Sequence, residues 1–159
     1  MVFNPCLNHL RNTDEAAEAA QDVFVKVHEK LPGFKGDATM RTWIYRITIN
    51  TCLDRLKARK RKKRSLLGRF SLSDEQVERS ASLVFDHPGV AAEDREALER
   101  LFAVVDELPE QQKTALLLKT TEDLSMNAIA DVMGLSPKAV ESLLSRARAN
   151  LRKRLPNEG

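Results

Sequence analysis

Aromatic residues are scarce in this chain of 159 residues, where Phe, Trp and Tyr together make up 5%. The apolar positions are filled mainly by Leu, Ala, Val and Ile, which recur at helical spacing. We therefore expect an all-α protein. Because 42% of the residues are hydrophobic, the chain can form packed cores, which excludes wholesale disorder. Its length suits one domain or two small ones.

Cysteine and histidine are equally few. Cys6 and Cys52 lie far apart and form no CxxC pair, and the three histidines show no metal-binding spacing such as HExxH. We expect reduced, structural thiols, and neither a metal site nor a cofactor. The sequence also offers no nucleophile–base pair and no Gly-rich phosphate loop, so we do not expect an enzyme.

Long apolar runs are absent as well. No stretch approaches the roughly 18 residues of a membrane span, and no apolar signal-peptide core follows Met1. We expect a cytoplasmic protein that does not insert into membranes.

Charge is strongly segregated along the chain, although the net charge is only +3. Eight of the ten residues from Arg55 to Arg64 are Lys or Arg, whereas the stretch from Asp74 to Glu110 holds eleven acids and three Arg. A solvated helix end would explain the basic run, but so many neighbouring cations repel one another unless an anion is near. A nucleic-acid backbone is the partner that this run favours.

The segment from Leu124 to Leu151 predicts two helices joined by a tight turn. Ser125 is a suitable N-cap for the first helix, and Gly134 supplies the positive φ that the turn needs. Ser136 then caps the second helix, with Pro137 at its first position. The apolar residues of the second helix recur at helical intervals and define a buried face: Val140, Leu144, Ala147 and Leu151. This is the build of a DNA-binding helix-turn-helix, with an ordinary helical hairpin as the alternative.

The first half predicts three helices. They are a short one within residues 2–11, a long one from Asp14 to about Leu31 that Thr13 or Asp14 caps, and a third from about Thr39 to Arg61. The buried face of the long helix is expected to consist of four residues: Ala17, Ala20, Phe24 and Val27.

Periodicity fades after the basic run and returns later. Residues 65–89 are rich in Gly, Ser and Pro breaks, which indicates a flexible linker. Helicity resumes at Val90 and continues through four helices. We therefore predict two small helical domains, residues 1–64 and 90–155, of which the second contains the helix-turn-helix.

Both halves together resemble one known family. Residues 109–155 are similar to region four of a bacterial RNA polymerase sigma factor, and residues 12–64 to region two of the same family. The resemblance in region two is carried by a set of short motifs: Gln21-Asp22-Val23-Phe24, Phe34-Lys35-Gly36, the TWIYRI run of residues 42–47, Asn50 and Leu53-Asp54-Arg55-Leu56. With only these two regions and a short linker, the chain resembles the compact extracytoplasmic-function subclass.

The resemblance implies a non-catalytic transcription initiation factor that binds core RNA polymerase, recognises promoter DNA and helps to melt it. An anti-sigma factor is a further partner that it suggests. It implies polymerase contacts at Glu18, Gln21 and Asp22. It implies upstream duplex contacts at Lys138, Glu141, Ser142, Ser145, Arg146 and Arg148. It implies downstream and melted-strand contacts at Arg41, Trp43, Tyr45, Arg46, Asn50, Arg55 and Arg59.

The residue chemistry suits this division. Melted bases stack on aromatic rings beside a cationic groove, whereas duplex bases are recognised by short or bidentate polar side chains on a groove helix. Trp43 can equally be a core residue, and the two roles are compatible. Three departures from the family stand out: a shortened first helix, Ala17 where an acid is usual, and Glu141 with Leu143 where Lys and Arg are frequent.

An autonomous helix-turn-helix regulator that binds an operator without polymerase is the alternative function. Such a regulator would need a dimer interface or a sensor domain, and the first half shows neither a heptad seam nor a ligand-pocket signature.

Overall fold

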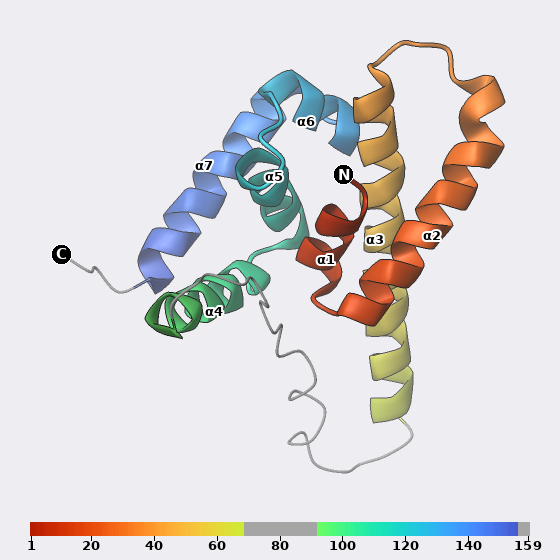
Figure 1. Cartoon of the computed structure of the whole chain (residues 1–159). Coiled ribbons are helices and arrows are strands. Elements are labelled where there is room, and N and C mark those ends of the chain that lie inside the picture. Colours follow the sequence, from red (N-terminus) through yellow and green to blue (C-terminus); the bar gives the residue numbers. More distant parts are fainter. Residues whose placement is uncertain (69–91, 156–159) are drawn as a thin grey trace. The chain divides into compact units, whose positions relative to one another are not determined.

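The computed structural model describes residues 1–68 and 92–155, and every regular element in these two ranges is a helix (Figure 1). The chain divides into two compact units, Met1–Leu83 and Val84–Gly159. The predicted all-α class is confirmed. None of the described helices is long and apolar enough to cross a membrane.

The described part of the first unit, residues 1–68, forms three helices that all contact one another: α1 (Phe3–Leu10), α2 (Thr13–Lys30) and α3 (Met40–Leu67). A short 3-10 turn, η1 (Leu31–Gly33), ends α2 where the sequence Pro32-Gly33 stops the helix. The core between the helices is built from small and branched residues, among them Cys6, Leu10, Ala19, Val23 and Ile47.

The start of α2 differs from the prediction. Its N-cap is Asn12, whose side-chain oxygen accepts the backbone N–H of Glu15 at 2.9 Å, rather than Thr13 or Asp14. Asn12 has an extended backbone, which is the usual conformation of a cap, and this leaves Thr13 and Asp14 inside the first turn.

The buried face of α2 was predicted only in part: Ala20 is buried and Val27 packs against the core, but the other two predicted residues are exposed. Ala17 is exposed and Phe24 is 61% exposed, whereas Ala16, Ala19, Ala20 and Val23 are buried. Both sets of residues follow a helical period, so the sequence pattern alone allowed either face. The packed face contains three alanines, Ala16, Ala19 and Ala20, whose small side chains allow neighbouring helices to approach α2 closely.

Helix α3 is longer than expected and contains the whole basic run. Thr39 caps it by accepting the N–H of Thr42, and the helix continues past Arg61 to Leu67. Lys, Arg and Leu are good helix formers, and cations near a helix C-terminus are favoured by its dipole. Residues 65–67 of the predicted linker therefore belong to α3, and residues 69–89 lie outside the described residues.

The second unit has the four predicted helices: α4 (Ala92–Asp106), α5 (Glu110–Thr120), α6 (Met126–Met133) and α7 (Pro137–Arg154). Helix α7 contacts each of the other three. Two polar contacts also hold the C-terminal part of α7. Asn150 donates a hydrogen bond to the Gln112 side chain at 2.8 Å, and Arg154 forms an ion pair with Glu107 at 2.5 Å. The last turns of α7 are thereby linked to the junction between α4 and α5.

Candidate functional site

The α6–α7 turn has the local geometry that the sequence predicts. Ser125 accepts the N–H of Ala128, and Ser136 accepts the N–H of Ala139. Gly134 has φ of 65°, which is the left-handed conformation that ends α6. These caps confirm the helix-turn-helix.

The outward face of α7 carries most of the residues predicted to contact duplex DNA. Lys138, Glu141, Ser145, Arg146 and Arg148 are all exposed on this helix, and Ser142 is half-buried. The opposite face is buried, as expected from the apolar spacing. Leu143 is 8% exposed, so it packs in this structure and is not open to a thymine methyl group.

In the first unit, the cations of the basic run lie on several sides of α3, and two of them extend an exposed stripe that begins earlier in the helix. Arg46, Asn50, Lys57 and Arg64 recur at intervals of 4, 7 and 7, so they lie along one exposed stripe. Lys57 and Arg64 also line a shallow hollow with three neighbouring residues, Asp54, Lys60 and Arg61. This stripe points away from the core, where a polyanion can reach it.

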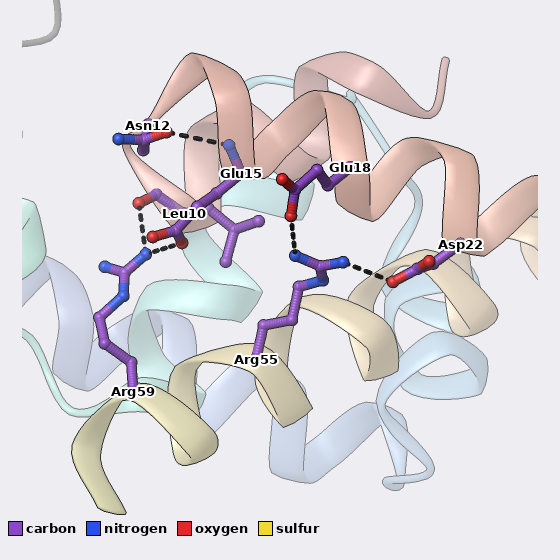
Figure 2. A network of polar contacts seen from close by, with 7 residues as sticks. All are labelled: Leu10, Asn12, Glu15, Glu18, Asp22, Arg55 and Arg59. Atoms are coloured by element: carbon purple, nitrogen blue, oxygen red, sulfur yellow. Dashed lines mark hydrogen bonds and ion pairs between the residues drawn. The ribbon is translucent and has the colours of Figure 1, made fainter. Parts of the chain in front are cut away.

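Arg55 and Arg59 lie on the other side of α3, facing α2 (Figure 2). Arg55 Nη2 donates to Asp22 Oδ2 at 2.5 Å, and its Nη1 donates to Glu18 Oε2 at 3.3 Å. The hydrogen bond to Asp22, and with it the bond to Glu18, raises the pKa of Arg55 above its ordinary value despite partial burial. The guanidinium thus bridges two carboxylates that lie one turn apart on α2.

Arg59 continues this α2–α3 charge ladder, which we define as Glu15, Glu18 and Asp22 on α2 with Arg55 and Arg59 on α3. Its Nη2 donates to the Glu15 carboxylate and to the backbone oxygen of Leu10 at 3.3 Å (Figure 2). Arg59 therefore ties the last turn of α1 and the first turn of α2 to α3.

The ladder brings together residues that were predicted to serve different partners. Glu18 and Asp22 were expected to contact polymerase, and Arg55 and Arg59 to contact DNA. Acids at intervals of 3 and 4 and arginines at an interval of 4 are visible in the sequence. Their pairing was missed because it joins residues 33 to 44 positions apart, and it depends on which faces of α2 and α3 meet.

The aromatic residues near the start of α3 are mostly packed. The rings of Trp43 and Phe34 have centroids 5.0 Å apart with a tilt of 46°, and Trp43 is half-buried against the core of the first unit. Tyr45 is 1% exposed, with the Arg41 guanidinium 5.6 Å from its ring centroid. A base can therefore not stack on Tyr45 unless its ring is first uncovered.

The two cysteines meet in the core of the first unit. Both are buried free thiols, and a hydrogen bond from Cys52 to Cys6 joins α3 to α1. That bond and burial raise the pKa of Cys52 above its ordinary value. Among the described residues, no three His, Cys, Asp or Glu side chains are grouped so as to hold a metal ion.

Comparisons with known proteins match both units to one family. Residues 1–62 match the model "Sigma-70 region 2", and residues 98–151 match "Sigma-70, region 4". The chain is 34% identical to RNA polymerase sigma-H factor of Pseudomonas aeruginosa, over 97% of this chain and 80% of that protein. It is 28% identical to the ECF RNA polymerase sigma factor SigW of Bacillus subtilis, over 97% of this chain and 82% of that protein.

A solved structure shares the fold. The chain is similar, with a TM-score of 0.71 and 18% identity, to the sigma factor RpoE of Bartonella quintana, which was solved in complex with the anti-sigma factor NepR. The similarity covers 99% of this chain and 91% of that one. With the two region models matched in order and a relative above 30% identity along most of its length, the chain belongs to the sigma-70 family of RNA polymerase sigma factors, and within it to the extracytoplasmic-function type.

Proposed function

We propose that this chain directs core RNA polymerase to promoters by recognising two promoter elements with its two units. The observation that carries this proposal is the presence of two exposed polar helix faces, one on α3 and one on α7, in a chain that matches both sigma regions. The chain itself supplies recognition, and polymerase supplies the chemistry.

The second unit recognises the upstream element as duplex DNA. Its exposed α7 residues combine cations for phosphates with short polar side chains and one acid for base edges. Glu141 near the start of α7 can accept a hydrogen bond from a cytosine amino group, whereas Arg146 and Arg148 lie further along the helix and suit phosphates.

The first unit binds the downstream element as melted strand. Arg46 and Asn50 begin the exposed stripe of α3, and its cations continue to Arg64. Because Tyr45 is buried, the stacking role rests on the exposed part of Trp43 at the start of the helix. Arg41, which is exposed at the same end, is the cation nearest to that position in sequence.

Helix α2 provides the polymerase-binding face. Glu18, Gln21 and Asp22 are exposed there, and Val25 is 58% exposed beside them on the same side of the helix. An apolar centre with a polar rim is the usual arrangement of a protein interface. Binding to polymerase places the chain in the bacterial cytoplasm, and an anti-sigma factor that covers these faces is a further partner.

Reconstitution tests this function. The purified chain is mixed with core RNA polymerase, and co-elution and transcription are measured on a library of templates with randomised promoters. We expect a complex that initiates from a defined subset of templates, whereas core polymerase alone does not select them. A stable dimer that binds a palindromic site and never associates with polymerase would instead establish an autonomous regulator.

A further inference from the structure

The α2–α3 charge ladder has an inner and an outer side. The side chain of Arg55 is 28% exposed, whereas those of Glu18 and Asp22 are 70% and 51% exposed. The cation thus lies beneath two carboxylates that face solvent (Figure 2). On this side of α2, the two acids are therefore more accessible to a partner than Arg55 is.

Two carboxylates one turn apart on a helix repel each other. The positive charge of Arg55 offsets this repulsion. Because the guanidinium is planar and rigid, its two hydrogen bonds fix the position of one oxygen of each carboxylate. Each carboxylate keeps a second oxygen that is available to a donor from outside. The acids are therefore preorganised, which lowers the entropy that a partner must remove when it binds them.

The same acids belong to a continuous exposed face. Glu18, Gln21, Asp22 and Val25 are spaced so that they share one side of α2. The stripe of α3 that suits DNA lies on the opposite side of that helix from Arg55. The Arg55 side chain therefore contacts the acids of the α2 face and does not belong to the stripe.

We infer that Arg55 is a positioning residue of the polymerase-binding face, which holds Glu18 and Asp22 in place, and that it is not a DNA contact. This inference rests on the proposed function, since it assigns polymerase to that face. It replaces the role in DNA binding that the sequence suggested for Arg55. Arg59 acts in the same ladder by fixing the first turn of α2.

The experiment compares two single charge removals on α3, Arg55→Gln and Lys57→Gln. Lys57 is two residues away and on the exposed stripe, so the two variants have the same net charge and differ in the side of the helix. Two quantities are measured for each full-length variant: its affinity for core RNA polymerase, and the salt dependence of its binding to single-stranded DNA. Circular dichroism gives the folded fraction at the same temperature.

We expect Arg55→Gln to weaken polymerase binding roughly 3- to 10-fold, as for the loss of one coupled ion-pair network, with an unchanged salt slope for DNA. Lys57→Gln should leave polymerase binding unchanged and lower the salt slope by roughly 0.7. Arg55→Lys should restore little, because an ammonium group cannot bridge both acids in a fixed geometry. In a variant that already carries Glu18→Gln and Asp22→Asn, the change Arg55→Gln should have no further effect on polymerase binding.

The inference is overturned if Arg55→Gln lowers the DNA salt slope as much as Lys57→Gln does, or if polymerase binding stays at the wild-type level. A loss of polymerase binding that equals the loss of folded protein also overturns it, since Arg55 would then act only on stability. If Arg55→Gln does not fold, the Glu18→Gln and Asp22→Asn variant, with Arg55 retained, must show the polymerase defect. Failure of the wild-type chain to bind polymerase is a separate result, which contradicts the proposed function itself.

Discussion

At the residue scale, Gly134 and Trp43 show how single residues shape the two recognition elements. Gly134 turns the chain from α6 to α7 with φ of 65°, and an added Cβ would meet no heavy atom within 4 Å. Any cost of a side chain there is therefore a backbone cost rather than a clash. Trp43 fastens the loop before α3 through its contact with Phe34.

Gly134→Ala should destabilise the second unit by about 1 kcal/mol, because alanine is strained in the left-handed conformation. Gly33→Ala is the matched control, since Gly33 also has open space around it but lacks a positive φ. Its effect should stay within about 0.5 kcal/mol. Urea denaturation of the full chain gives both values, and equal effects would mean that φ at Gly134 is not the cause.

Trp43→Ala should cost the first unit about 1–3 kcal/mol, less than a fully buried aromatic, because Trp43 is only half-buried. Trp43→Phe should keep most of the contact with Phe34 and most of the stability. If melted bases also stack on Trp43, the Phe variant should still reduce promoter opening by polymerase, as measured by permanganate reactivity of unpaired thymines. Normal opening with Trp43→Phe would leave Trp43 with a packing role alone.

At the element scale, the sequence predicted what is local and missed what is long-range. The caps at Ser125 and Ser136 were predictable because each depends on a contact three residues away. The buried face of α2 was not, since two overlapping sets of apolar residues fit the same period. The pairing of Arg55 with Asp22 was not predicted, because the two residues lie on different helices and 33 positions apart.

The exposed stripe of α3 should dominate the electrostatic part of DNA binding. Lys57→Gln with Arg64→Gln should lower the salt slope for single-stranded DNA by about 1.4, at roughly 0.7 per phosphate contact. Lys62→Gln with Lys63→Gln removes the same charge from other sides of the helix and should lower the slope clearly less. Equal decreases would show that the basic run acts as a diffuse charge rather than as one face.

The exposed face of α7 should separate affinity from specificity. Arg148→Ala should weaken all upstream sequences alike, because phosphate contacts do not distinguish bases. Glu141→Lys should change the preferred base at one position by roughly 1–3 kcal/mol. Binding of the full-length variants to randomised upstream duplexes measures both effects. A uniform gain in affinity with Glu141→Lys would show that Glu141 only repels phosphate.

At the scale of the whole molecule, the two units are expected to be independent folds. Each has its own buried core, and the described helices that contact one another extensively belong to the same unit. A protease site introduced between residues 68 and 92 should therefore give two fragments that both keep their helical content and unfold in separate transitions. Loss of structure in either fragment after cleavage would show that one unit depends on the other.

Division of promoter recognition between the units is the central claim, and selection of promoters by the polymerase complex tests it most directly. Transcripts are sequenced from a library in which the upstream and downstream elements are randomised independently, with the wild-type chain, Glu141→Lys and Asn50→Ala. We predict that Glu141→Lys changes only the selected upstream sequence and that Asn50→Ala changes only the selected downstream sequence. A change in both elements with either variant, or no selection beyond that of core polymerase alone, would contradict the account.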